Sequence, residues 1–98
     1  MSDSVRVVAR LTARPETLEA LKTAALEVLG PTRKEAGCVR YELLQNHADS
    51  LDLTFVEEWA SAAALDGHMK SPHIAKFLGA AGSLLGGAPD IRRFRVLG

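Results

Sequence analysis

The stretch CVRYELLQNHADSLDLTFVEEW, residues 38–59, decides the fold. In its first part Val39, Tyr41 and Leu43 alternate with a second set of residues, and its last part again carries apolar side chains at every second position. The turn-forming composition NHADS separates the two runs. Together these features predict a β-hairpin.

A helix is expected before the hairpin. Apolar residues recur at helical spacing through RPETLEALKTAALEVLG, residues 14–30, and Pro15 suits a first helical position. Pro31 cannot donate a hydrogen bond to the preceding turn, so a kink or a short break is expected there. TRKEAG then continues as helix and ends at a glycine cap, Gly37.

Two consecutive helices are expected after the hairpin. Ser61 can cap the first, and Ser71 followed by Pro72 has the composition of a second helix start. The second helix carries an apolar stripe made of Ile74, Phe77, Leu78, Ala81 and Leu85.

Strands are expected near both ends of the chain. SVRVVARLTA, residues 4–13, and DIRRFRVL, residues 90–97, both alternate at period two. The element order is then βαββαβ with one antiparallel hairpin, which is typical of the ferredoxin-like arrangement. The sequence therefore predicts an α+β fold, a four-stranded antiparallel sheet with helices on one face.

The sheet face away from the helices is expected to keep apolar side chains among arginines and glutamates. Water would then contact more contiguous apolar area than monomers usually tolerate. A second copy that uses the same patch about a two-fold axis is the simplest cover, so we expect a homodimer. The apolar residues concerned are Val8, Leu44, Val56 and either Phe94 or Leu97.

Length and composition fit one small domain that spans residues 1–98. The chain is 47% hydrophobic and 24% charged, an ordinary globular balance. Its 12 basic and 12 acidic side chains cancel, so no net field favours nucleic acid or anionic lipid. No apolar run approaches the roughly 20 residues of a membrane span, and the lone Cys38 cannot form an intramolecular disulfide. A cytoplasmic protein is expected.

The sequence offers little for a cofactor or a metal. It contains no GxGxxG after a strand, no GxxxxGK[ST] and no GxSxG, so flavin, nicotinamide and nucleotide chemistry lack support. On one helix His68 and His73 would lie about 140° apart, unlike the zinc-binding pair at i and i+4, although Pro72 separates them. We therefore expect neither a cofactor nor a metal.

Glu57 is the residue that an ordinary core explains least. It shares a strand face with Phe55 and Trp59. Either a cation such as Arg10 or Arg40 pairs with it, or it is desolvated and its pKa rises toward that of a base near neutral pH. Trp59 is either a core aromatic or a pocket wall whose indole N–H binds a substrate oxygen.

RKEAGCVRYELLQ, residues 33–45, followed by TFVEEWASAAALDGHMKSPHIAKF, residues 54–77, resembles the antibiotic biosynthesis monooxygenase domain. The resemblance covers nearly the whole chain and implies a dimeric α+β barrel in which two sheets face each other. The shared pattern is R-x-E-x-G-C-x-x-Y, then E-x-W, then H-x-x-S-x-H before an aromatic, here Arg33, Glu35, Gly37, Cys38, Tyr41, Glu57, Trp59, His68, Ser71, His73 and Phe77.

The closest likeness within the family is to small quinol monooxygenases that use no cofactor. The haem-degrading and polyketide branches look to use an asparagine with the tryptophan, whereas this chain has Ala9, Arg10 and Phe55 at the strand positions concerned. A deprotonated hydroquinone is electron-rich enough to reduce dioxygen itself. The resemblance therefore implies oxidation of a quinol-like or polyphenolic aromatic with dioxygen.

On this hypothesis His68 or Glu57 assists deprotonation, and Arg40 or Tyr41 steadies the developing charge. The substrate pocket is expected to consist of Trp59, Tyr41, Phe55, Phe77 and Arg40.

Two alternative functions stay open. One is a non-catalytic dimeric ligand-binding or stress-related protein. The other is an isomerase of a small phosphorylated ketone, whose phosphate site would have to come from Arg92, Arg93 and Arg95.

Overall fold

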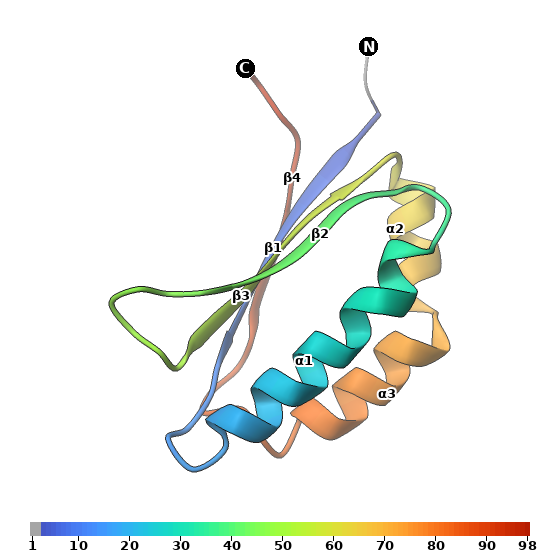
Figure 1. The fold of residues 1–98 in the computed structure, drawn as a ribbon. Helices are drawn as coiled ribbons and strands as arrows, with labels where there is room; N and C mark the ends of the chain where they lie inside the picture. Colours follow the sequence, from blue (N-terminus) through green and yellow to red (C-terminus); the bar gives the residue numbers. More distant parts are fainter. Residues whose placement is uncertain (1–2) are drawn as a thin grey trace.

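The computed structural model describes residues 3–98, which form a four-stranded antiparallel sheet with three helices on one of its faces (Figure 1). The strands lie in the order β2-β3-β1-β4. The predicted α+β, ferredoxin-like arrangement is confirmed. The elements are β1 (Val5–Thr12), α1 (Leu18–Arg33), β2 (Cys38–Gln45), β3 (Asp52–Trp59), α2 (Ala62–Met69), α3 (Pro72–Ala81) and β4 (Asp90–Phe94).

The predicted hairpin of β2 and β3 is present, but its first residues are irregular. Cys38 pairs with Trp59, and the register then shifts so that Val39 is an extra residue without a partner in β3. Val39 is 59% exposed, so the expectation that it shares a face with Tyr41 is wrong. A bulge turns one side chain out of the alternation, and here it places Cys38 on the Trp59 face.

Helix α1 is continuous across Pro31, so the expected short break is absent. Pro31 lies in the last turn, and the carbonyl that it leaves without a donor belongs to Glu27, an exposed residue. The helix also begins later than Pro15 and ends at Arg33, so the expected continuation to Gly37 is wrong. Residues 34–37 form a turn instead.

The two serine caps are confirmed. The hydroxyls of Ser61 and Ser71 each accept a hydrogen bond from the backbone N–H three residues later. Leu85, expected on the α3 stripe, lies beyond the end of that helix and pairs with Ala13 in an isolated bridge. Residues 82–89 therefore connect α3 to β4 along the edge of the sheet.

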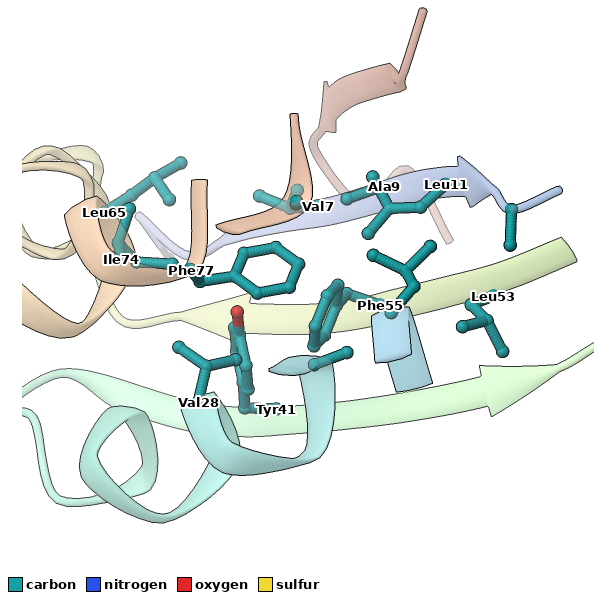
Figure 2. Close-up of a cluster of buried hydrophobic side chains, with 14 of the residues drawn as sticks. Val7, Ala9, Leu11, Val28, Tyr41, Leu53, Phe55, Leu65, Ile74 and Phe77 are labelled. Atoms are coloured by element: carbon teal, nitrogen blue, oxygen red, sulfur yellow. The ribbon is translucent and has the colours of Figure 1, made fainter. Parts of the chain in front are cut away.

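The core lies between the sheet and the helices. Figure 2 shows Val7 and Ala9 of β1 and Phe55 of β3 on the side that faces Phe77 of α3. The rings of Phe55 and Phe77 meet edge to face, with centroids 5.8 Å apart. Burial of one such side chain stabilises a fold by about 1.5–3 kcal/mol, so these contacts fix α3 against the sheet.

The other sheet face carries no helix among the described residues (Figure 1). Val8 pairs with Val56 there, and both are half-buried. Leu44 and Phe94 are 49% and 47% exposed. Strand β4 ends at Phe94, short of the expected residue 97, because its pairing reaches Arg6 near the start of β1. Covering of this face by a second copy stays a prediction.

Candidate active site

A cavity of about 150 Å³ lies between the sheet and helices α2 and α3. A cavity of that volume holds about one benzene ring. Its mouth lies beside the exposed side chains of Met69, Leu78 and Ile91. Most of the lining is apolar, and the polar groups that reach it belong to Tyr41, Glu57, His68 and Arg93.

Glu57 is desolvated, so the alternative of an ion pair is wrong. Its side chain lines the cavity, the residue is 5% exposed, and it forms no ion pair with any residue from 3 to 98. Arg10 instead contacts Asp52, at 3.0 Å. Arg40 lies on the opposite sheet face, opposite Glu58 in the register, and outside the cavity.

The environment of Glu57 prepares the carboxyl for proton transfer near neutral pH. Burial raises the pKa of Glu57 to about 7, the hydrogen bond from Trp59 lowers it, and the charge of Glu35 raises it. A base works best when its pKa lies near the operating pH, because it is then both available and sufficiently basic. Glu57 therefore meets the electrostatic requirement for a general base.

Trp59 supports Glu57 from behind the cavity wall. The indole Nε1–H donates to Glu57 Oε1 over 2.9 Å, so the partner of this N–H is a carboxylate within the chain. Trp59 is fully buried, and its ring lies against that of His68 with centroids 4.6 Å apart. Trp59, which was expected to line the pocket, therefore lies behind the cavity wall, where its contacts orient Glu57 and His68.

Three predicted pocket residues do come together at the cavity. The Tyr41 ring centroid lies 5.2 Å from that of Phe55 and 5.4 Å from that of His68. Phe77 also lines the cavity, and Figure 2 shows its ring together with those of Tyr41 and Phe55. Burial and the nearby charge of Glu57 raise the pKa of Tyr41. The phenol therefore keeps its proton at neutral pH and can donate a hydrogen bond.

Glu35 joins the two histidines of the shared pattern. Its Oε2 lies 2.6 Å from His68 Nδ1 and 2.8 Å from His73 Nε2. The two histidines can meet because Ser71 and Pro72 begin a new helix between them, as the sequence predicts. Sequence reasoning had assigned no role to Glu35; the signal was its place in the R-x-E-x-G-C pattern.

Gly37 allows the turn that carries Glu35 to approach α2. Its φ is +87°, and a Cβ at this position would lie 2.6 Å from the Cβ of Ala64. The carbonyl of Gly37 accepts a hydrogen bond from Ala60 N–H over 2.8 Å. A glycine is required where φ is positive and a helix packs this closely, so the local sequence places Glu35 beside His68.

Burial lowers the pKa of His68, and the hydrogen bond from its ring to the carboxylate of Glu35 opposes that effect. The imidazole is therefore neutral at pH 7. Its Nδ1 is engaged by Glu35, and the remaining nitrogen has no hydrogen-bond partner in the described part of the chain. Because the ring lines the cavity, this nitrogen is available to a bound molecule.

The arginines of β4 do not converge on an anion. Arg93 lies at the edge of the cavity and contacts Asp66 over 3.4 Å, whereas Arg92 pairs with Val8 on the opposite sheet face. Cys38 is no candidate nucleophile, because burial and the charge of Glu35 raise the pKa of its thiol.

Comparison with known families identifies the family to which the chain belongs. The family model described as antibiotic biosynthesis monooxygenase matches residues 4–80. This range includes the cavity wall up to Leu78 and the cluster of Glu35, His68 and His73. The chain belongs to the antibiotic biosynthesis monooxygenase family. The resemblance seen in the sequence pattern is thereby confirmed.

Relatives within the antibiotic biosynthesis monooxygenase family match the chain over most of its length. A Mycobacterium tuberculosis protein named "Putative monooxygenase Rv0793" is 38% identical over 85 residues, which cover 87% of this chain and 83% of that protein. The solved structure of Rv0793 superposes with a TM-score of 0.93, at 32% identity, over 97% and 96% of the two chains. The structure of PA3566 from Pseudomonas aeruginosa superposes with a TM-score of 0.92 at 33% identity, and the match covers 100% of this chain and 98% of that chain.

Proposed function

We propose that this protein is a cofactor-independent monooxygenase that oxidises a quinol-like or polyphenolic aromatic with dioxygen. The observation that carries the proposal is the carboxyl of Glu57, which lines a mostly apolar cavity, forms no ion pair among residues 3–98 and has a pKa of about 7. Its neighbours at the cavity are aromatic rings and a neutral imidazole. Such a site suits removal of a phenolic proton from a planar ring.

The substrate supplies the electrons in this proposal. Glu57 takes the proton of a phenolic O–H, and the resulting phenolate is oxidised by dioxygen. For hydroquinone, one oxygen atom enters the ring and the other leaves as water, so that hydroquinone plus dioxygen becomes hydroxybenzoquinone plus water. Tyr41 donates a hydrogen bond to the developing oxyanion, and the dry walls formed by Phe55 and Phe77 strengthen that interaction.

The size of the cavity favours a substrate with one ring. About 150 Å³ suits a benzene-sized group, whereas a naphthoquinol such as menadiol would have to extend through the mouth past Met69 and Ile91. Hydroquinone or catechol should accordingly have a lower KM than menadiol.

We also propose that the functional unit is a homodimer formed through the open sheet face. Val8, Val56, Leu44 and Phe94 give that face an apolar centre, and charged residues surround it. Light scattering on the wild type should give twice the mass of one chain, and Val56→Glu should give the mass of one chain. A cytoplasmic location stays a prediction from the sequence.

Oxygen uptake tests the catalytic proposal. Wild-type protein in excess chelator should consume dioxygen with hydroquinone faster than the uncatalysed autoxidation, and label from ¹⁸O₂ should appear as one atom in the product. Glu57→Gln should lower the rate by about 10²–10⁴-fold, and His68→Gln should lower it as well. Glu27→Gln, on the exposed side of α1, is the matched control.

Two outcomes would contradict the proposal in different ways. If hydroquinone binds but uptake equals autoxidation, the protein is a ligand-binding member of its family. If a phosphorylated ketone is converted without oxygen, it is an isomerase. The isomerase alternative has little support in the fold, because Arg92 and Arg93 point to opposite faces of β4.

A further inference from the structure

Glu35, His68 and His73, hereafter the His-Glu-His cluster, lie beside the cavity, and Glu35 and His73 have no part in the chemistry assigned to Glu57. One carboxylate oxygen and one nitrogen from each imidazole all lie within 4.8 Å of one another. We propose that the cluster binds a divalent transition-metal ion of the first row, such as zinc.

The distances in the cluster fit a metal after a small adjustment. Zinc binds imidazole nitrogen and carboxylate oxygen at about 2.0–2.2 Å in a tetrahedral arrangement, so ligand atoms around one ion lie about 3.4 Å from each other. Oε2 of Glu35 is 2.6 Å and 2.8 Å from the two ring nitrogens, held there by hydrogen bonds. An ion that replaces these two hydrogen bonds needs Oε2 to move about 0.6–0.8 Å away from the two ring nitrogens, which lie within 4.8 Å of each other.

The cluster has a rigid side and an accessible side. The side chain of His68 is 2% exposed, while those of Glu35 and His73 are 18% and 20% exposed. The buried imidazole fixes the depth of the site. The partly exposed pair leaves a route for entry and room for water molecules to complete the coordination shell, as catalytic three-ligand zinc sites do.

The backbone around the cluster is ordered before any ion arrives. The Glu35 N–H donates to Thr32 O over 3.0 Å, and the Glu35 carbonyl accepts from Cys38 N–H over 3.1 Å. The Ser71 hydroxyl donates to the carbonyl of His68 over 2.7 Å and caps α3, the helix that carries His73. Because three segments are already held in place, binding requires little further ordering.

The donor set selects the kind of ion. Two imidazoles and one carboxylate suit zinc, copper, nickel, cobalt or iron, whereas magnesium and calcium prefer oxygen ligands alone. A neutral imidazole carries one N–H, so an ion that replaces the hydrogen bonds to Glu35 requires this proton to lie on the ring nitrogen that faces away from the ion.

Calorimetry on untagged, chelator-stripped protein tests the site directly. Zn²⁺ should bind with one site per chain, Mg²⁺ at the same concentration should give no saturable binding, and Co²⁺ should develop d–d absorption bands. Glu35→Gln and His73→Gln should each weaken Zn²⁺ binding at least about 10-fold. His47→Gln, which removes the exposed histidine of the hairpin loop, should leave the affinity unchanged.

The outcomes separate a metal site from a hydrogen-bonded cluster that only joins the helices. Circular dichroism first establishes that each variant is folded; if Glu35→Gln unfolds, the partly exposed His73→Gln carries the test. Absence of saturable Zn²⁺ binding, or equal binding by wild type and His73→Gln, would overturn the proposal. The readout is independent of oxygen uptake, so a failure of the proposed monooxygenase activity would leave this result interpretable.

Discussion

Replacement of Glu57 with Gln should stabilise the protein at alkaline pH while it removes the base. Glutamine keeps the shape of the side chain and an oxygen that accepts the indole N–H of Trp59, but it cannot ionise. In the wild type, burial raises the pKa of Glu57 from 4.5 to about 7. At about 1.4 kcal/mol for each pH unit, ionised Glu57 is about 3 kcal/mol less favourable in the fold than in the unfolded chain.

Because burial raises the pKa of Glu57, ionisation of this residue destabilises the folded protein as the pH rises. The folded state binds the proton of Glu57 more tightly, so its contribution to stability is fully present below pH 4.5 and is lost as the pH rises through about 7. The Gln variant has no such loss. The two proteins should be nearly equal at pH 4.5, and the variant should be more stable by up to about 3 kcal/mol at pH 8.

Urea unfolding at one protein concentration measures this difference, with the single tryptophan as the fluorescent reporter. His68, whose pKa is lowered by burial, produces an opposite trend, but this trend is common to both proteins and cancels in the comparison. Glu27→Gln should show no dependence of this kind, since Glu27 is exposed. A difference between Glu57→Gln and wild type that stays constant from pH 4.5 to pH 8 would refute the reasoning.

Three further predictions test other parts of the structure. Gly37→Ala should lower the unfolding free energy by about 1–3 kcal/mol, because φ is +87° and the added Cβ would meet α2. In Gly67→Ala the added Cβ meets nothing within 4 Å, so this change should stabilise the helix by about 0.5–1 kcal/mol. Thermal unfolding of the two variants measures the difference. Trp59→Phe removes the donor that lowers the pKa of Glu57, so the acidic limb of the pH–rate profile for oxygen uptake should move to higher pH. Cys38 should react with a thiol reagent more slowly than free cysteine at pH 7.5, because its pKa is raised, and an equal rate would contradict this.

The features that the sequence predicted correctly depend on neighbours along the chain. Ser61 and Ser71 cap helices through contacts three residues away, and the hairpin follows from two alternating runs around a turn. The features that the sequence did not predict depend on where a residue lies within its helix and on how two strands pair. Pro31 is tolerated because of its place in the last turn of α1, and Val39 leaves its expected face because of a bulge that alternation alone does not reveal.

The same division holds at the site. Tyr41, Phe55 and Phe77 meet because strand alternation and the helical stripe both direct apolar residues to one core. By the same alternation Arg40 lies on the opposite face from Tyr41, outside the cavity that it was expected to line. Glu35 reaches His68 across 33 residues of sequence, and no local pattern specifies a contact of that range.

The two carboxylates of the site have different surroundings, and each difference has a physical consequence. Glu57 is dry, has the neutral indole of Trp59 as its donor, and has a raised pKa. Glu35 retains contact with water and holds two imidazoles, an arrangement that suits a cation. Because the negative charge of Glu35 contributes to the raised pKa of Glu57, any cation that neutralises the His-Glu-His cluster should lower the pKa of Glu57. Burial remains the main cause of the raised pKa of Glu57, and the charge state of the cluster adjusts how readily this base ionises.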